Sequence, residues 1–390
     1  MISAVMPTYA RADIAFEHGE GAYLFSTTGE KYLDFASGIA VTALGHSHPH
    51  LVETLITQGK KLWHTSNLFQ IPGQTRLAER LVANSFADTV FFGNSGAEAG
   101  ELAIKIARKY QHDTGHPERY RIIGCQGAFH GRTLATLAAA GNEKYLKGYD
   151  PVVEGFDHVA FDNLNELRAK IGPETAGIIV EPVQGEGGIR PASTAFLKGL
   201  RAAADEFGLV LIFDEVQCGM GRTGRLWAHE WAGVTPDVMM VAKGLGGGFP
   251  VGACLATEKV ASVMGPGAHG STFGGNALAM SIGNAVLDVM LAPGFLANVE
   301  TQAKALRAKL ETVAAAHPKV LSGVRGAGLI LGLQSLVPNG EFVDALRRHK
   351  MLAVTAADNV VRLVPPLIIG PREIDEAGAA IDAACRSWVS

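Results

Sequence analysis

The middle of the chain, from residue 89 to residue 256, alternates short apolar runs with helical segments, and no other feature constrains the fold so strongly. The helical segments include Ala97–Tyr110, Thr133–Ala140 and Thr194–Phe207. Nearly continuous apolar strands separated by helices predict a mostly parallel sheet with helices on both faces. Ligands of such sheets bind at the carboxyl ends of the strands. The predicted strands are Thr89–Phe92, Arg121–Cys125, Gly177–Val180, Leu209–Phe213, Val238–Val241 and Gly252–Ala256.

The regions on either side of this alternation have different patterns. Gly21–Phe35 has the pattern of an antiparallel hairpin, and two long helical segments, Asn276–Leu291 and Glu300–Ala316, follow the alternating region. Short strands at Leu329–Leu333 and Val360–Leu363 come next, which predicts a smaller α+β domain. The predicted parts are an N-terminal arm and hairpin packing with the small domain (1–45), a large ligand-binding α/β domain (46–285) and the small C-terminal domain (286–390).

Composition and charge argue against several classes of function. The formal net charge of −4 does not favour binding to nucleic acid or to an anionic membrane. No apolar run approaches the roughly 20 residues that span a bilayer, and the N-terminus has no pattern of a secretory signal. The four cysteines are scattered and form no Cys-x-x-Cys pair, which argues against disulfides and zinc and favours a reducing cytoplasm.

Two charged residues follow apolar strands that we expect to lie in the same sheet. Asp214 ends the run Leu209–Phe213, and Lys243 comes just after Val238–Val241 and before a run of glycines. A lone acid in this place more often caps a helix, and a lone lysine is more often a solvated loop residue. Together they are what a pyridoxal phosphate enzyme needs, because the lysine can form a Schiff base with the aldehyde while the acid keeps the pyridine nitrogen protonated. The displaced lysine can then move a proton between carbon atoms.

Two further segments could complete such a site. Gly93–Ala99 follows an apolar strand and opens a helix, whose N–H groups and dipole favour an anion such as a phosphate. Ser95 could add a hydroxyl there, or could serve only as the N-cap. In the segment Gly127–Arg132, Phe129 could stack on a ring and Arg132 could hold a carboxylate with two hydrogen bonds. Neither segment is specific on its own.

Taken together, six segments resemble the class-III pyridoxal-phosphate-dependent aminotransferases. They are Asn94–Ala99, Phe129–Arg132, Glu181–Gly188, Asp214–Gln217, Ala242–Gly248 and Gly270–Asn276, in this order. The resemblance extends from about Tyr9 to the C-terminus, and the set of motifs is highly specific. Within the class, Met6–Arg11, Phe129–Leu134 and Gly221–Gly224 are most similar to the acetylornithine aminotransferase group.

The resemblance implies an α/β protein with the type I aminotransferase fold, built on a mostly parallel sheet of the seven-stranded type. It implies pyridoxal 5'-phosphate as the cofactor and a homodimer with shared active sites. The implied reaction transfers the terminal amine of N2-acetyl-L-ornithine to 2-oxoglutarate and gives N-acetyl-L-glutamate 5-semialdehyde and L-glutamate, a step of arginine biosynthesis in the cytoplasm. No nucleic acid, membrane or metal partner is implied.

It also implies roles for individual residues, with Lys243 and Asp214 as the catalytic pair. Gly96 and Ala97 would bind the phosphate by their backbone, and Thr272 would reach the phosphate of the neighbouring subunit's cofactor. The full implied set of cofactor-binding residues is Ser95, Gly96, Ala97, Phe129, Asp214, Glu215, Val216, Gln217, Lys243 and Thr272, where Phe129 stacks on the ring and Gln217 bonds its hydroxyl. The implied substrate-binding residues are Arg132, Ser271, Glu186 and Arg362, where Arg362 receives the α-carboxylate of 2-oxoglutarate and Glu186 holds that arginine otherwise.

The chain departs from the family pattern at two positions. Ala97 stands where many members have threonine, which removes a hydroxyl near the phosphate, and Asn276 is followed by Ala277 instead of proline. Other readings stay open: a succinylornithine, ornithine or 4-aminobutyrate transaminase, a mutase or decarboxylase of the same class, or a binding protein without catalysis. The last is disfavoured because such a protein would be expected to lose Lys243 or Asp214. His46, His48 and His50 alternate near Pro49, which is more typical of a polar turn than of a metal site.

Overall fold

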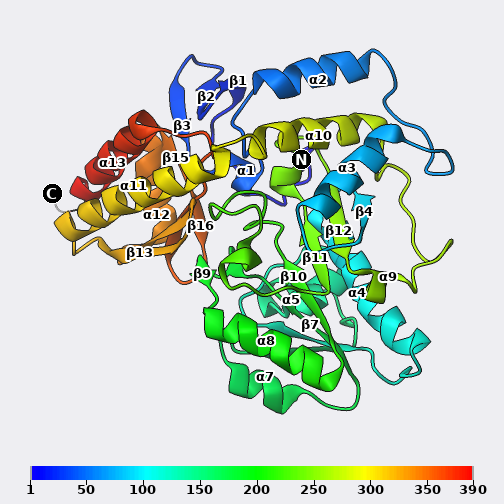
Figure 1. Cartoon of the computed structure of the whole chain (residues 1–390). Helices are drawn as coiled ribbons and strands as arrows, with labels where there is room; N and C mark the ends of the chain where they lie inside the picture. Colours follow the sequence, from blue (N-terminus) through cyan, green and yellow to red (C-terminus); the bar gives the residue numbers. More distant parts are fainter. Residues whose placement is uncertain (1, 389–390) are drawn as a thin grey trace.

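A computed structural model of the chain describes residues 2–388, and its centre is a seven-stranded sheet (Figure 1). The strands pair in parallel except β12, which runs antiparallel to both of its neighbours. The expectation of a mostly parallel sheet is therefore confirmed. In order across the sheet the strands are β4 (Thr89–Gly93), β12 (Gly252–Ala256), β11 (Val238–Val241), β10 (Val210–Asp214), β7 (Thr175–Val180), β5 (Arg121–Cys125) and β6 (Phe156–Val159).

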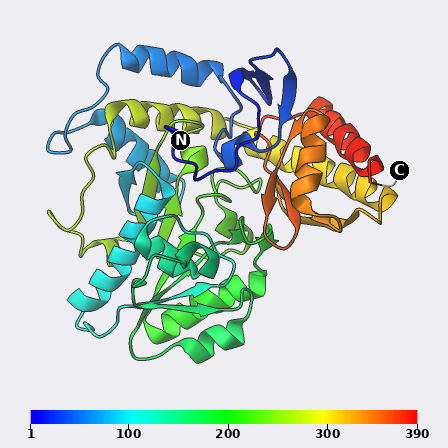
Figure 2. The ribbon, with the colours of Figure 1, turned by 180° about the vertical axis from the view of Figure 1, so that it is seen from behind.

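Helices cover both faces of this sheet because its central strands are apolar on both sides. On β10, Leu211 and Phe213 pack into the core beneath α7 (Leu164–Lys170) and α8 (Thr194–Phe207). Ile212, which lies between them, packs into a second core with α4 (Gly96–Asp113) and α5 (Leu134–Ala140). These two helices cover the other face of the sheet, which is turned toward the viewer in Figure 2. Successive side chains of a strand point to opposite faces, so one apolar run supplies two cores.

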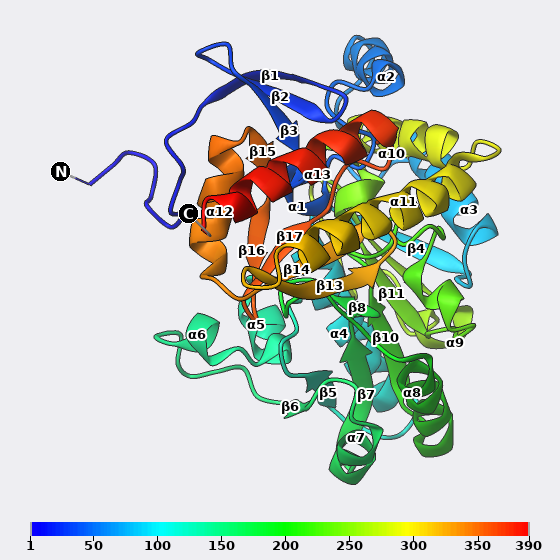
Figure 3. The ribbon, with the colours of Figure 1, turned by 90° about the vertical axis from the view of Figure 1, so that its left-hand side faces the viewer.

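A second structural region combines the C-terminal part of the chain with the N-terminal strands (Figure 3). The short strand β15 (Met351–Leu352) pairs with β3, which joins the predicted hairpin to the C-terminal region. Its sheets are β1 (Phe16–Glu20), β2 (Tyr23–Ser26), β3 (Lys31–Asp34) and β15, and then β13 (Leu321–Ala327), β14 (Ile330–Ser335), β17 (Val360–Leu363) and β16 (Val354–Ala356). The helices of this region are α11 (Phe295–Ala316), α12 (Asn339–Arg348) and α13 (Pro371–Arg386), whereas α10 (Ala277–Met290), which precedes them, packs mainly against the helical segment 49–83.

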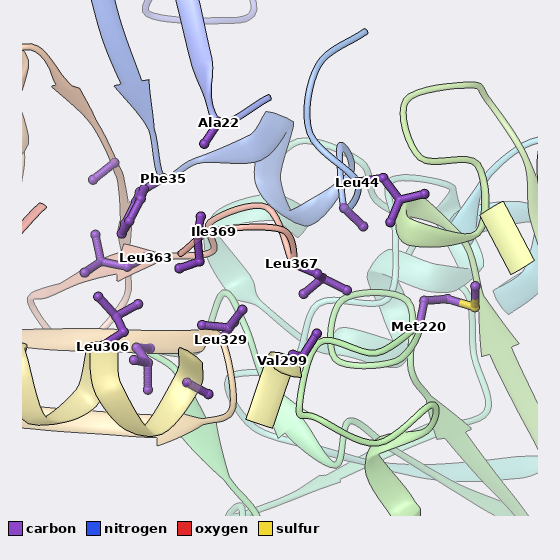
Figure 4. Close-up of a cluster of buried hydrophobic side chains, with 14 of the residues drawn as sticks. Ala22, Phe35, Leu44, Met220, Val299, Leu306, Leu329, Leu363, Leu367 and Ile369 are labelled. Atoms are coloured by element: carbon purple, nitrogen blue, oxygen red, sulfur yellow. The ribbon is translucent and has the colours of Figure 1, made fainter. Parts of the chain in front are cut away.

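One apolar core connects this region with the loops of the large sheet (Figure 4). It contains Phe35 after β3, Leu363 on β17, Val299 on α11 and Met220 in the loop after β10. The C-terminal region is thereby packed against the loops that follow the central strands. The proposed boundaries at residues 45 and 285 remain predictions.

Several predicted elements differ from the observed ones at their ends. The helix predicted from Glu300 begins at Phe295, and the strand predicted to end at Phe213 includes Asp214. Helices α2 (Pro49–Gly59) and α3 (Pro72–Ala83) were not predicted; in both, proline occupies the first turn, a position where its missing N–H costs nothing. The remaining elements are α1 (Ser37–Ala40), α6 (Glu143–Leu146), α9 (Glu258–Ala261), β8 (Val183–Gln184), β9 (Arg190–Pro191), η1 (Ala228–Trp231) and η2 (Lys243–Leu245).

Between residues 2 and 388, no single helix has the length and apolar character needed to cross a membrane. The pair α10 and α11 meets that test only when taken together, and the two helices are bent by 71° relative to each other.

Candidate active site

A cavity of about 400 Å³ lies at the carboxyl ends of the parallel strands. It is lined by residues at or after the ends of β4, β5, β7, β10 and β11 and by Val41, so six separate parts of the chain meet there. The structure brings together these residues singled out from the sequence: Ser95, Gly96, Ala97, Phe129, Arg132, Asp214, Val216, Gln217 and Lys243. The cavity is also lined by His130 and Glu181, for which the sequence suggested no role.

Lys243 begins the 3-10 helix η2 directly after β11, with a φ of 46° that is unusual for a residue with a side chain. Backbone strain of this kind persists only where the surrounding structure holds it, and it occurs often at functional sites. Burial of the amine, with the positive charge of Arg362 as the second cause, lowers the pKa of Lys243 to about 8. A larger share of this amine is therefore neutral near pH 7 than in a solvated lysine, which makes it a better nucleophile.

Asp214 ends β10 as a buried carboxylate with two defined partners. Its Oδ2 lies 2.8 Å from His130 Nδ1, and its Oδ1 accepts a hydrogen bond from Val216 N at 3.0 Å. Burial opposes a charge on His130, but the hydrogen bond and charge of Asp214 outweigh it, so the pKa of His130 is raised. These two contacts keep the Asp214 carboxylate oriented at the edge of the cavity.

The N-terminus of α4 forms one end of the cavity. Ser95 is the N-cap, and its Oγ accepts a hydrogen bond from Glu98 N at 3.2 Å. A Cβ on Gly96 would lie 2.9 Å from Val216 Cγ1, so only glycine fits at this position. The first N–H groups of a helix have no acceptor within the helix, and Gly96 and Ala97 line the cavity, where the helix dipole favours an anion.

A buried ion pair lies beside Lys243. Arg362 on β17 donates from Nη1 to Glu186 Oε1 at 2.6 Å and to Gln217 Oε1 at 3.0 Å. The side chain of Arg362 is 2% exposed and that of Glu186 is 28% exposed. The pair joins two residues that are 176 positions apart, and the acidic member is the one with access to solvent.

Glu181 follows β7 and ties two loops of the site together. Its Oε1 accepts a hydrogen bond from Phe129 N at 2.9 Å, and its Oε2 accepts one from Gly185 N at 3.0 Å. Burial, and then the negative charge of Asp214, raises the pKa of Glu181. No spacing rule connects Glu181 with Phe129, so only the folded chain reveals this contact.

Five residues with roles implied by the resemblance do not line the cavity: Arg362 and Glu186 of the ion pair, and also Glu215, Ser271 and Thr272. Glu215 is buried elsewhere, where its carboxylate accepts from Ala228 N at 2.6 Å and lies 2.7 Å from His229 Nδ1. Ser271 Oγ accepts from Gly274 N at 2.9 Å, and Thr272 is exposed. Both lie in the segment between α9 and α10, at the edge of the molecule in Figure 1.

Two of the three alternating histidines pair with separate acids. His46 Nε2 lies 2.8 Å from Asp34 Oδ2, and His50 Nε2 lies 2.9 Å from Asp288 Oδ2. Across the part of the chain that the structure describes, no group of three or more His, Cys, Asp or Glu side chains is arranged to hold a metal ion.

The site thus combines an amine with a lowered pKa, an oriented carboxylate, an aromatic ring, a helix N-terminus and two arginines. These groups suit an organic cofactor with an aldehyde, a protonatable ring nitrogen and a phosphate. A Cβ on Gly96 would collide with Val216, which also lines the cavity, so glycine allows the N-terminus of α4 to pack closely against that wall. The residues present therefore fit pyridoxal phosphate.

Comparison with known proteins gives consistent matches over the whole chain. The family model described as Aminotransferase class-III matches residues 5–385. The acetylornithine aminotransferase of Mesorhizobium japonicum is 58% identical over 384 residues, covering 98% of this chain and 96% of the relative.

Two solved structures show the same fold. N-acetylornithine aminotransferase from Stenotrophomonas maltophilia has a TM-score of 0.86 and 38% identity, and the match covers 98% of each chain. Ornithine aminotransferase from Toxoplasma gondii has a TM-score of 0.95 and 28% identity, and the match covers 99% of this chain and 93% of that one.

Proposed function

The chain belongs to the class-III aminotransferases and is a pyridoxal-phosphate-dependent enzyme, and from this premise we propose that its amino donor is N2-acetyl-L-ornithine. The amine would pass to 2-oxoglutarate, giving N-acetyl-L-glutamate 5-semialdehyde and L-glutamate, a step of arginine biosynthesis. The observation that carries this choice of substrate is the 58% identity, over 98% of the chain, to a relative named acetylornithine aminotransferase.

A panel of amine donors with 2-oxoglutarate as acceptor tests the choice of donor. We expect the specificity constant kcat/KM to be highest for N2-acetylornithine and lower for N2-succinylornithine, ornithine and 4-aminobutyrate. Ornithine is the most serious competitor, because the Toxoplasma gondii ornithine aminotransferase has a TM-score of 0.95 with this chain. A higher kcat/KM for ornithine would replace the proposal with that activity.

The chemistry divides between cofactor and protein. When bound, pyridoxal phosphate supplies an aldehyde that takes up amines and a protonated ring that withdraws electrons. Lys243 would hold the cofactor covalently through Nζ and, once displaced by substrate, would carry a proton between substrate and cofactor carbon atoms. Asp214 would keep the ring nitrogen protonated, Phe129 would stack on the ring, and the N–H groups of Gly96 and Ala97 would bind the phosphate.

Two substrates of different shape must use the same cavity. The donor reacts at a terminal amine, whereas the acceptor reacts at a carbon that carries a carboxylate. Arg362 would bind the carboxylate of the acceptor. While the donor is bound, that carboxylate is absent, and Arg362 would be a buried charge without a partner, which is energetically costly. The 2.6 Å contact from Arg362 to Glu186 supports a switch in which Glu186 neutralises the arginine while the donor is bound and moves away for the acceptor.

Substitutions at the pair should therefore separate the two half-reactions. Arg362→Ala is expected to slow the 2-oxoglutarate half-reaction more than the acetylornithine half-reaction, since only the former needs the guanidinium. Glu186→Ala leaves Arg362 open and should favour α-amino donors such as glutamate over acetylornithine. Charged hydrogen bonds of this kind are worth about 1.5–3 kcal/mol, so single-turnover rates should differ by about 10- to 100-fold. Equal losses in both halves for Arg362→Ala would leave the pair only a structural role.

We also propose a homodimer in which Thr272 serves the partner's site. Thr272 is exposed and outside the cavity of its own chain, and the neighbouring segments carry the exposed apolar side chains Trp63 (67%), Leu68 (89%), Phe69 (67%) and Phe273 (60%). Exposed apolar groups gathered in this way are typical of interfaces. Sedimentation at assay concentration should give a dimer or larger species, and a fully active monomer would contradict shared sites.

The cellular location and the domain boundaries belong to the same proposal. Cys125, Cys218, Cys254 and Cys385 are all buried free thiols, which supports a reducing compartment such as the cytoplasm. We place the boundaries between the arm, the large domain and the small domain after residues 45 and 285.

A further inference from the structure

The guanidinium of Arg132 is in contact with aromatic rings instead of acids. Its Cζ lies 3.9 Å from the centre of the Tyr145 ring and 5.4 Å from the centre of the Phe129 ring. These two rings meet edge to face, with centroids 6.4 Å apart and planes at 88°. Within residues 2–388, the guanidinium makes no ion pair or hydrogen bond, although it lines the cavity.

The two arginines of the site are therefore held in opposite ways. Nη1 of Arg362 already donates to Glu186 and Gln217, so a substrate carboxylate that binds this group must displace Glu186. An aromatic ring instead attracts the flat face of a guanidinium and leaves its N–H edge free. That edge is the part that binds a carboxylate with two parallel hydrogen bonds. Arg132 is thus open to a carboxylate at every stage of the reaction.

The local backbone places Tyr145 behind Arg132. Helix α5 ends at Gly141, which has a φ of 64°, and a Cβ there would lie 2.3 Å from His158 Nε2, so the reversal requires glycine. Asn142 then caps the short helix α6, accepting a hydrogen bond from Lys144 N at 3.1 Å. Tyr145 on this turn is half-buried and does not itself line the cavity, so it acts on substrate through the side chains that it contacts, of which Arg132 is the one that would bind a carboxylate.

We propose that Tyr145 is a positioning residue that holds Arg132 by its face and so presents the N–H edge to the far carboxylate of each substrate. This rests on the proposed function, in which Arg132 binds that carboxylate. In both half-reactions a substrate carboxylate would lie at Arg132, so a substitution of Tyr145 should affect the two half-reactions equally. Substitutions of the Glu186–Arg362 pair should instead affect one half-reaction more than the other.

The test compares Tyr145→Leu, which removes the ring, with Tyr145→Phe, which keeps it. Cation–π contacts are worth about 0.5–2 kcal/mol, so Tyr145→Leu should raise KM for acetylornithine and for 2-oxoglutarate by about 2- to 30-fold. We expect kcat to stay within about twofold, because the ring does not touch the reacting atoms. Tyr145→Phe should retain the wild-type KM values.

A donor without the carboxylate makes the readout specific. N-acetylputrescine is acetylornithine lacking the carboxylate, so its kcat/KM should be unchanged by Tyr145→Leu. A matched control is Phe207→Leu, since Phe207 supports Arg168 at 5.4 Å in a similar contact on helix α8, far from the site, and should leave every KM unchanged.

Three outcomes would overturn the proposal: unchanged KM values in Tyr145→Leu, an equal rise in Tyr145→Phe, or an equal loss for N-acetylputrescine. The second would assign the effect to the hydroxyl, and the third to general disruption of the site. A failure of the proposed function can be distinguished from a failure of this proposal, because the donor panel tests the function with the wild-type enzyme alone. If ornithine proves the better donor, the same comparison runs with ornithine and putrescine.

Discussion

Replacing Lys243 with alanine is expected to lower the turnover number for transamination by more than about a hundredfold while leaving the fold intact. A positioned acid–base group alone contributes about 10²- to 10⁴-fold to a rate, and Lys243 would also hold the cofactor. Its side chain lines the cavity, so its loss should change stability little. The lowered pKa of about 8 supports this role, since it favours the neutral amine that attacks an aldehyde.

Steady-state and single-turnover rates with acetylornithine measure this effect, with circular dichroism to check the fold. Lys109→Ala is the matched control, because Lys109 lies on α4 and pairs at 2.7 Å with Asp113 on the same helix. It should retain wild-type rates. A Lys243→Ala enzyme that keeps more than about a hundredth of wild-type turnover would show that another group carries the proton.

Asp214→Asn is expected to slow the half-reaction with the amino donor by about 10- to 100-fold, while the cofactor still binds. The change preserves shape but removes the charge that would hold the proton on the ring nitrogen, and hydrogen bonds to charged groups are worth about 1.5–3 kcal/mol. It also weakens the contact with His130, which lies 2.8 Å from Asp214 in a buried position.

Stopped-flow absorbance of the donor half-reaction gives the rate directly. Asp237→Asn is the matched control, because Asp237 Oδ2 accepts a hydrogen bond from Leu211 N at 2.8 Å and contacts Arg201 at 3.0 Å just before β11, at the strand end opposite to the cavity. That variant should lose stability without losing rate. If the traces of Asp214→Asn overlay those of the native enzyme, Asp214 has no part in activating the ring.

The same substitution has a consequence for stability as a function of pH. Because the folded pKa of His130 is raised, its protonated form contributes stability that is complete below its unfolded pKa of about 6.5 and is lost as pH rises through the folded value. Without the Asp214 charge, burial favours neutral His130, and this contribution should disappear. Thermal unfolding of both proteins between about pH 5 and pH 9 would reveal it as a difference in slope.

Much of the fold was predictable because burial on both faces of a parallel sheet leaves a local pattern. The run Leu209–Phe213 is apolar at every position since one side of β10 packs under α8 and the other under α4. The direction of a strand leaves no such pattern in the sequence. β12 is as buried as its neighbour β11, yet it runs antiparallel to both neighbouring strands. The ends of elements were also less certain, because caps and turns depend on contacts outside the element.

The sequence by itself indicated the family, through the resemblance of six motifs in order, and the fold class, through its alternation of apolar strands and helices. It also indicated the candidate pair Lys243 and Asp214, because residues that follow parallel strands meet at one edge of the sheet. Only the tertiary structure decided which side chains support them. His130 and Asp214 are 84 positions apart, and Glu186, in the turn between β8 and β9, is 176 positions from Arg362 on β17. Tyr145 reaches Arg132 through a turn between two helices. Such contacts arise from the path of loops across the sheet edge, which follows no periodicity in the sequence, so only the folded chain could show them.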